Sequence, residues 1–506
     1  MTTPGHPAAD GSIAHLVAEL RGRSVSVGEV MARHAERIEQ AARYRAVIAQ
    51  PDPDDLAAAA AAAQRRIDQG DEAPMLGVPI TVKDIVAVRG MPLTAGSRLL
   101  RDHRARLDAP VVGMLRRAGA IPVAKTNCPE FGFGVGTSND LYGTTVNPWG
   151  PELLTGGSSG GEAVAVALGL SLLGVGSDFG GSIRWPAQSL GVLGLRPTPG
   201  RIPRTGQLVG IGTTGLDGHA VLDPSSLQGV VQVPGLLART VDDLELALGA
   251  SACGDVASRL DPLHVAVPLR SSAAVDLAAV AIGIADGSGI GPMGDDMRMA
   301  IDALVHDLAA DGLRVTMLPG VFQGCREAYD RLRSFDELAD LQALATGRDD
   351  QLTAAARATL AAARWTAGPG QPSRAEQRSV AWEAAVTARA AGWAQLAATP
   401  LVVLPVAPGA AAGTDETMVV GGQVLRGFDI MAHCRAVSLL GAPVLSIPID
   451  RSPAGLPLSV QVVAPPWAED LVLALGRRLE SLRGGCQSPP GRKEHNKKRG
   501  PIEKMA

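Results

Sequence analysis

The N-terminal part of the chain has the spacing of amphipathic helices. In its first segment apolar residues recur at helical intervals, at Ile13, Leu16, Val17 and Leu20. An alanine-rich run at 56–63, followed by polar residues up to residue 71, also favours a helix. We therefore expect residues 12–70 to be mainly helical. A short β-branched segment at 76–82 follows, and it predicts a strand that ends at Lys83.

Further along the chain, helical patterns alternate with short apolar segments. The expected helices lie at 111–118, 163–168, 340–398 and 469–482, and the expected strands at 121–124, 170–175, 401–406 and 444–449. The segment 340–398 is rich in Ala, Arg and Gln, which places its helices outside the sheet. This alternation predicts an α/β protein whose mixed or parallel sheet is covered by helices.

Composition supports a large folded core and excludes several classes of protein. Of 506 residues, 46% are hydrophobic and 19% are charged, so a disordered or collagen-like chain is not expected. Lys and Arg number 47 against 51 Asp and Glu, which gives a net charge of −4. Binding of nucleic acid through bulk positive charge is therefore not expected. Aromatic residues make up 3%, so the core must consist mainly of aliphatic side chains.

The chain carries no pattern of a membrane span or a secretory signal. Its longest apolar run, 163–176, is shorter than the roughly 20 residues that a bilayer requires. The first residues lack a basic stretch followed by an apolar one. The cysteines are scattered without a C-x-x-C pair, at Cys128, Cys253, Cys325, Cys434 and Cys486. We expect a soluble cytoplasmic protein with no membrane partner, no disulfide framework and no metal site.

Glycine is concentrated in two short clusters near the centre of the chain. The first is GGSSGG at 156–161, and the second is SDFGGS at 177–182. A flexible linker is one interpretation, but a linker does not normally lead into apolar segments on both sides. Two interpretations that involve binding or catalysis therefore compete.

A nucleotide-binding loop is the first of these interpretations. The cluster at 156–161 is not followed by Gly-Lys-Ser/Thr, so it does not match a P-loop. The spacing G-x-G-xxx-G at 174–180 resembles a dinucleotide loop, but Pro186 stands where the following helix should continue. No acidic residue lies at 194–204 to bind a ribose. Nucleotide binding is therefore disfavoured.

Nucleophilic catalysis is the second interpretation. Ser182 follows Gly180 and Gly181, and glycine amides without side chains can converge on one anion. This pattern predicts a nucleophilic serine whose neighbouring N–H groups form an oxyanion hole. Such a serine needs a base. Lys83 is a candidate, because burial at a strand end lowers the pKa of an amine.

Other candidate groups for catalysis are less favoured. Sequence alone cannot place His103, His219 or His433 near the glycine clusters. The run Lys125-Thr-Asn-Cys128-Pro-Glu130 contains the residue types of a Cys-Glu-Lys amidohydrolase. That chemistry needs three groups that converge from separate elements, so a local cluster is weak support for it.

Long segments of the chain resemble the amidase signature family. The central segments are GGSSGGEAVAVALG, GVGSDFGGSIRWPA and GLRPTPGRIPRTG. Those before them are LGVPITVKDIVAVRGMPLTAGS, DAPVVGMLRRAGAIPVAKTNCPEFGFG and NDLYGTTVNPWGP. Those after them are LLARTVDDLELAL, GAPVLSIPID, GLPLSVQVVAP and EDLVLALGRRLE. The resemblance covers residues 10–482 and is weaker at 255–400.

This resemblance implies the architecture of the chain. It implies an α/β fold in which a single large domain, 1–483, has a central mixed twisted β-sheet covered by helices on both faces. Within this domain we expect N-terminal helices at 10–75 and a catalytic core at 76–205. After residue 483 the composition becomes basic and nearly free of large apolar residues. It predicts a disordered tail at 484–506.

The resemblance also implies a Ser–cis-Ser–Lys triad. Ser182 is expected to be the nucleophile, Ser158 the bridging serine after a cis peptide bond, and Lys83 the base. The backbone amides expected to form the oxyanion hole are those of Phe179, Gly180, Gly181 and Ser182. The residues expected to support the loops are Ser159 and Asp178. The expected walls of the substrate pocket are Phe131, Phe133 and Phe179.

The function implied is hydrolysis of a small-molecule carboxylic acid amide, with no metal or organic cofactor. A homodimer is expected from the resemblance alone. The alternative is the A subunit of a glutamyl-tRNA(Gln)-type amidotransferase, which generates ammonia from glutamine. The region 340–400 lacks the arginine- and tyrosine-bearing stretch of such subunits, which favours a stand-alone enzyme. An inactive binding protein is disfavoured because Lys83, Ser158 and Ser182 are all present.

Overall fold

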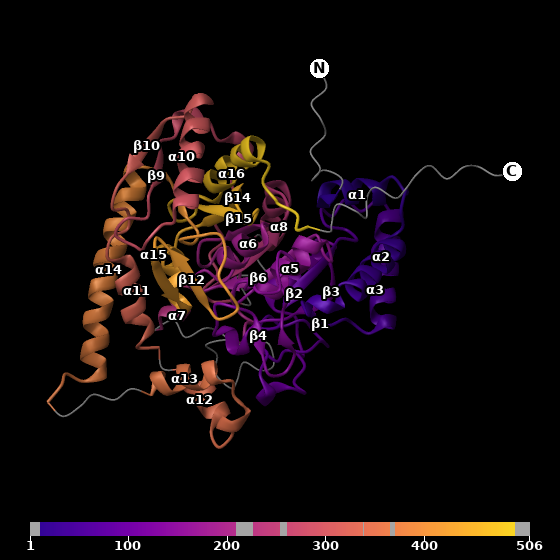
Figure 1. Ribbon diagram of the computed structural model, residues 1–506. Coiled ribbons are helices and arrows are strands. Elements are labelled where there is room, and N and C mark those ends of the chain that lie inside the picture. Colours follow the sequence, from indigo (N-terminus) through magenta and orange to yellow (C-terminus); the bar gives the residue numbers. More distant parts are fainter. Residues whose placement is uncertain (1–10, 209–225, 253–260, 337, 365–369, 491–506) are drawn as a thin grey trace.

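The computed structural model describes residues 11–208, 226–252, 261–336, 338–364 and 370–490 (Figure 1). The α-helices in these ranges are α1 (Ile13–Arg21), α2 (Val27–Gln40), α3 (Pro53–Asp68), α4 (Pro110–Arg117), α5 (Gly160–Leu168), α6 (Arg184–Leu190), α7 (Leu227–Val231), α8 (Val241–Ala252), α10 (Asp295–Ala310), α11 (Cys325–Arg333), α12 (Ala339–Ala345), α13 (Ala354–Ala363), α14 (Arg374–Ala398), α15 (Ala432–Leu439) and α16 (Glu469–Arg483).

The strands in the same ranges are short. They are β1 (Val47–Ala49), β2 (Pro79–Lys83), β3 (Ile121–Thr126), β4 (Ser138–Asn139), β5 (Gly143–Thr144), β6 (Leu173–Asp178), β7 (Leu193–Arg196), β8 (Val233–Ala238), β9 (Ile282–Ala285), β10 (Val315–Leu318), β11 (Leu401–Pro405), β12 (Thr417–Val420), β13 (Gln423–Arg426), β14 (Val444–Arg451) and β15 (Pro457–Val463).

A mixed sheet of eleven strands forms the centre of the described part of the molecule. Its strand order is β1-β3-β2-β6-β8-β7-β14-β15-β11-β9-β10. Strand β2 is parallel to β3 and β6, and β9 is parallel to β10 and β11. The other neighbours pair antiparallel. The expected α/β class with a mixed central sheet is confirmed.

Helices cover both faces of this sheet. On β14, Leu445 meets Gly476 of α16, whereas the adjacent Ser446 donates a hydrogen bond to the carbonyl oxygen of Arg184 in α6. Successive side chains of a strand point to opposite faces, so α16 and α6 lie on opposite sides of the sheet. Helices α2 and α3 lie at one end of the molecule, and the long helix α14 lies at the opposite end (Figure 1).

Most of the expected elements are present, and the differences have local causes. Helices α1–α3 occupy the predicted N-terminal segment, and α12–α14 occupy the predicted helical segment at 340–398. Contrary to expectation, a helix continues through Pro186. This residue stands in the first turn of α6, where its missing N–H is not needed. The remaining strands were not predicted: β1, β4, β5, β7–β10, β12, β13 and β15. Most of them have only two to four residues, too few for a clear alternation of apolar and polar positions.

The predicted division of the chain at residue 483 coincides with the end of α16. Residues 484–490 follow this helix, and 491–506 lie outside the described residues. The predicted disorder of the tail therefore stays a prediction.

Gly119 marks a tight approach between the end of α4 and the chain before β2. Its φ is +102°, and a Cβ there would lie 2.5 Å from Leu76 Cα. Gly70 has a comparable φ of +80°, but no atom lies within 4 Å of the position of its Cβ. A comparison of the two positions therefore distinguishes the cost of backbone strain, which is present at both, from the cost of steric overlap, which is present only at Gly119.

We expect Gly119→Ala to lower the free energy of unfolding by about 2–4 kcal/mol, because strain and overlap add. Gly70→Ala should lower it by about 1–2 kcal/mol, because only strain is present. Denaturant or thermal unfolding of both variants measures the difference. Equal losses for the two variants would contradict the close packing against Leu76.

Candidate active site

Lys83 is fully buried at the carboxyl end of β2. Its Nζ lies 2.7 Å from Ser158 Oγ, 3.1 Å from Ser159 Oγ and 3.2 Å from Ser177 Oγ. A neutral amine has two N–H donors and one lone pair, so it can donate to two of these hydroxyls and accept from the third. The structure thus surrounds the predicted base with three serines.

Burial lowers the pKa of Lys83 to about 8, because desolvation disfavours the charged ammonium. The carboxylate of Glu162 partly opposes this shift. That carboxylate is itself buried and accepts hydrogen bonds from Thr81 and Thr126 at 2.6 Å each. A fraction of Lys83 is therefore neutral near physiological pH, which is the form that can accept a proton.

The first glycine cluster shapes the loop that carries Ser158 and Ser159. The peptide bond between Gly157 and Ser158 is cis. A Cβ on Gly157 would overlap the carbonyl oxygen of Gly134. Gly156 has φ +75°, and a Cβ there would lie 2.6 Å from Pro186 Cα. Only glycine fits at these two positions, and this explains the cluster in physical terms.

The second cluster forms the loop between β6 and α6. Asp178, the last residue of β6, fixes the shape of this loop. Its carboxylate accepts hydrogen bonds from the backbone N–H groups of Gly181, at 2.9 Å, and Ile183, at 3.1 Å. It also forms a bidentate ion pair with Arg184 and lies 3.5 Å from Arg196 Nε. Burial alone would raise the pKa of Asp178, but these arginines lower it to about 2.

One of the four backbone amides expected to form an oxyanion hole, that of Gly181, already has a partner. Its N–H donates to Asp178 and is therefore not free for a substrate oxygen. In the part of the chain that the structure describes, no hydrogen bond uses the N–H groups of Phe179, Gly180 or Ser182. The Asp178 carboxylate would compete with a substrate oxygen for the Gly181 N–H, because it lies next to the loop. The local sequence does not reveal this competition.

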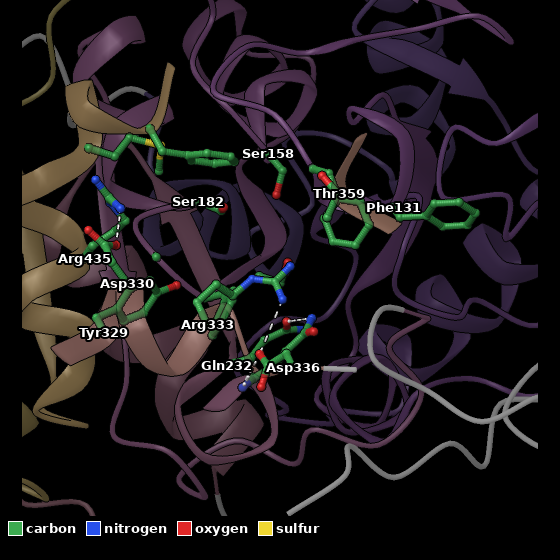
Figure 2. A pocket seen from close by; sticks show the side chains of 18 of the residues that line it. Phe131, Ser158, Ser182, Gln232, Tyr329, Asp330, Arg333, Asp336, Thr359 and Arg435 are labelled. Carbon is green, nitrogen blue, oxygen red and sulfur yellow. Dashed lines mark hydrogen bonds and ion pairs between the residues drawn. The ribbon is translucent and has the colours of Figure 1, made fainter. Parts of the chain in front are cut away.

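Ser158, Ser177 and Ser182 line one cavity of about 530 Å³. The loops of Ser158 and Ser182 are joined by a hydrogen bond from Ser159 N–H to the Ser182 carbonyl oxygen, 3.2 Å long. Figure 2 shows Ser158 and Ser182 on the same side of this cavity. The structure therefore places Ser158 and Ser182 at one cavity, and Lys83, which does not line it, in contact with Ser158.

The three phenylalanines expected as pocket walls all line this cavity. The rings of Phe131 and Phe133 lie 6.2 Å apart. The ring of Phe179 lies 5.3 Å from that of Tyr329 on α11. Aromatic side chains thus form part of the cavity wall, although aromatic residues are rare in the chain.

The residues of the possible Cys-Glu-Lys centre make contacts that stabilise the structure. Burial raises the pKa of the Cys128 thiol to about 12, so the thiol is protonated and poorly nucleophilic. Lys125 donates to the carbonyl oxygen of Val86, and Glu130 accepts from Ser97. These contacts do not support a Cys-Glu-Lys centre.

The histidines give no support for a histidine base. His433 is buried on α15, and its ring nitrogens make no hydrogen bond to a described residue. His103 does not line the cavity of Ser182, and His219 lies outside the described residues. Among the described residues, no group of three or more His, Cys, Asp or Glu side chains is arranged to hold a metal ion. No helix in the described ranges is long and apolar enough to cross a membrane.

Several residues of the site were not predicted from the sequence. Ser177 contacts Lys83, although it stands at the start of the second glycine cluster. Tyr329, Arg333 and Asp336 line the cavity from a segment in which the family resemblance is weak. Nothing in their local pattern distinguishes them from the polar face of a surface helix.

Comparisons with known proteins agree with this geometry. The family model described as Amidase matches residues 29–473. An indoleacetamide hydrolase from Bradyrhizobium diazoefficiens is 30% identical over 492 residues, which cover 95% of this chain and 88% of the relative. The A subunit of a glutamyl-tRNA(Gln) amidotransferase from Cupriavidus necator is 43% identical over 197 residues, or 39% of each chain.

A solved structure extends the agreement to the fold. The native peptide amidase from Stenotrophomonas maltophilia superposes with a TM-score of 0.77 and 26% identity, over 96% of this chain and 99% of that one. The matched region 29–473 includes β2, both glycine-rich loops and the elements of the central sheet. The chain therefore belongs to the amidase signature family of amidohydrolases.

Proposed function

We propose that this protein hydrolyses a neutral carboxylic acid amide through an acyl-Ser182 intermediate, with Ser158 and Lys83 as the proton relay. The observation that carries this proposal is the 2.7 Å contact between Lys83 Nζ and Ser158 Oγ in a fully buried site. The lowered pKa of Lys83 supports it, because a base must be neutral to accept a proton.

In the acylation step, neutral Lys83 accepts the proton of Ser158 while Ser158 accepts that of Ser182. The Ser182 oxygen attacks the amide carbonyl, and the free N–H groups of the loop stabilise the negative charge on the carbonyl oxygen. The relay then returns a proton to the leaving nitrogen. The carbon–nitrogen bond breaks, ammonia or an amine departs, and the acyl group stays on Ser182.

In the second step, water replaces the departed amine. It loses a proton to the relay and attacks the acyl carbonyl, and the carboxylate product leaves as Ser182 regains its proton. No charged group other than Lys83 is required for either step. Asp178 acts only through the loop, whose shape it fixes by binding two backbone amides.

The charges of the cavity support an uncharged substrate. The charged groups among its described lining residues are Asp330, Arg333, Asp336 and Arg435. Arg333 lies 3.5 Å from Asp336, and Arg435 forms an ion pair with Asp330. Each cation is thus paired with an anion within the wall. With aromatic walls on the other sides, the cavity favours an amide of an aromatic or apolar acid.

The second candidate function is ammonia production within a tRNA-dependent amidotransferase, which the 43% identity over 197 residues favours. Free glutamine carries both an ammonium and a carboxylate group. The charged side chains of the cavity are already paired with one another, so free glutamine would have to compete with these ion pairs, which favours a stand-alone amidase. The 30% identity to an indoleacetamide hydrolase over 95% of this chain supports the same choice.

Replacement of the nucleophile is the direct test of the proposed function. We expect the protein to release ammonia from arylacetamides, and Ser182→Ala to abolish both this release and labelling by a fluorophosphonate probe. Ser334→Ala is the matched control, because Ser334 also lines the cavity but its hydroxyl bonds only to the Arg331 carbonyl oxygen. Full labelling of Ser182→Ala would assign the nucleophile elsewhere.

The pH dependence of the reaction tests the base. Because only neutral Lys83 accepts a proton, kcat/KM should rise with pH up to about 8 and level off above it. Lys83→Met keeps the buried volume and should lower kcat/KM by at least about 10²-fold.

Lys125→Met is the control for this assignment, because burial also lowers the pKa of Lys125 to about 8. The variant should retain the inflection of the pH profile. Loss of the inflection in Lys125→Met, with retention in Lys83→Met, would transfer the role of the base to Lys125.

The paired charges of the cavity predict poor use of glutamine. We expect kcat/KM for phenylacetamide to exceed that for free glutamine by at least about 10²-fold, since a buried charge without a partner is costly to bind. Ammonia release from both amides at a range of concentrations measures the ratio. Preference for glutamine would favour the amidotransferase function.

A further inference from the structure

The guanidinium group of Arg333 lies inside the cavity, between two aromatic walls. Arg333 is the last residue of α11. Its Cζ lies 5.7 Å from the ring centre of Phe133 and 5.4 Å from that of Phe179. Both distances are within the range of cation–π contacts. Figure 2 shows the Arg333 side chain extending from α11 towards the middle of the pocket.

Asp336 fixes the position of this cation. It lies 3.5 Å from Arg333 Nη1 and accepts hydrogen bonds from the backbone N–H groups of Leu227, at 2.9 Å, and Gln228, at 3.3 Å. Asp336 is almost fully buried, so its place is set by α7 and not by solvent. The fixed carboxylate of Asp336 thus keeps the Arg333 guanidinium in the cavity and balances its charge.

The contacts of Arg333 leave much of its guanidinium open to the cavity. The contact with Asp336 is longer than the 2.7–2.9 Å of a strong charge-assisted hydrogen bond. It is the one hydrogen bond that the guanidinium makes within the described part of the chain. The Arg333 side chain is 23% exposed, so part of the guanidinium is accessible to a ligand in the cavity.

The surroundings of Arg333 match a flat aromatic ligand. The rings of Phe131 and Tyr329 lie beside those of Phe133 and Phe179, so Arg333 shares the cavity with a group of four rings. Phe428 and Arg435 also line the cavity. A planar ring in this space meets apolar ring faces and also a partly desolvated cation. The attraction between a cation and a ring face grows with the electron density of the ring.

We propose that Arg333 is a specificity-determining residue that selects amides whose acyl group carries a planar, electron-rich aromatic ring. This inference rests on the proposed amidase function and names its substrate class. The ring binds against the guanidinium, and the amide reaches the loop of Ser182. Asp336 is the positioning residue, because it neutralises Arg333 and so disfavours binding of a carboxylate in place of a ring.

Ring fluorination separates this contact from simple burial of apolar surface. It removes electron density from the ring face with little change in shape, and it makes the ring more hydrophobic. We choose phenylacetamide, its 4-fluoro and 3,5-difluoro derivatives and its pentafluoro derivative as probes. Their Kd values are measured by calorimetry on the Ser182→Ala variant, in which binding is independent of turnover.

We expect Kd to rise stepwise with fluorination, to a value about 5- to 30-fold weaker for the pentafluoro amide. Arg333→Met in the same background keeps the apolar stem and should abolish this ranking. Arg333→Lys keeps the charge and should retain it. Arg331→Met is the matched control, because Arg331 is exposed on the same helix and does not line the cavity.

Three results would overturn the proposal. They are a Kd independent of fluorination, the same ranking in Arg333→Met as in its parent, and the tightest binding for 4-carboxyphenylacetamide. Absence of binding by all of these aromatic amides would also overturn it. The proposed function fails in a different assay, by absence of ammonia release from any amide when Ser182 is present.

Discussion

The burial of an amine at the end of a strand is the constraint on which this site depends. Lys83 can serve as a base only while it is desolvated, and it is tolerated there only because three serine hydroxyls contact its Nζ. The sheet provides this arrangement directly. Because β2 and β6 are parallel neighbours, Lys83 and Ser177 emerge at the same edge. The loop of Ser158 then closes over that edge.

A second buried charge organises the other half of the site. Asp178 ends β6 and carries two arginines and two backbone amides. Burial of these ions costs free energy that their mutual attraction only partly returns. In exchange, the loop from Phe179 to Ser182 has one defined shape. One consequence is that the Gly181 N–H binds the Asp178 carboxylate and so helps to fix the loop.

Local pattern and the family resemblance were enough to predict that Lys83, Ser158 and Ser182 lie together, but not which residues form the opposite wall of the cavity. The glycine clusters and the strand before Lys83 are contiguous in sequence, so their roles could be inferred from them and from the family resemblance. The cation of Arg333 reaches the cavity only through the packing of α11, which no local pattern reveals. The same reason explains why the middle strands were missed, because they pair with strands far away in the chain. The contact between Gly181 and Asp178 spans only three residues, but the local sequence does not reveal that the carboxylate binds this amide.

The difference between the residues of the site that local pattern predicts and those that it does not predict has a physical origin. The loop that carries Ser158 tolerates little change, because Gly156, Gly157 and Gly161 in it lie against backbone. The opposite wall consists of side chains on α11 and the loop after it, and side chains there can change without disturbing β2 or β6. A family built in this way can keep one reaction and vary the acyl group it accepts. We therefore expect the segment with the weakest resemblance to determine which substrate this protein accepts.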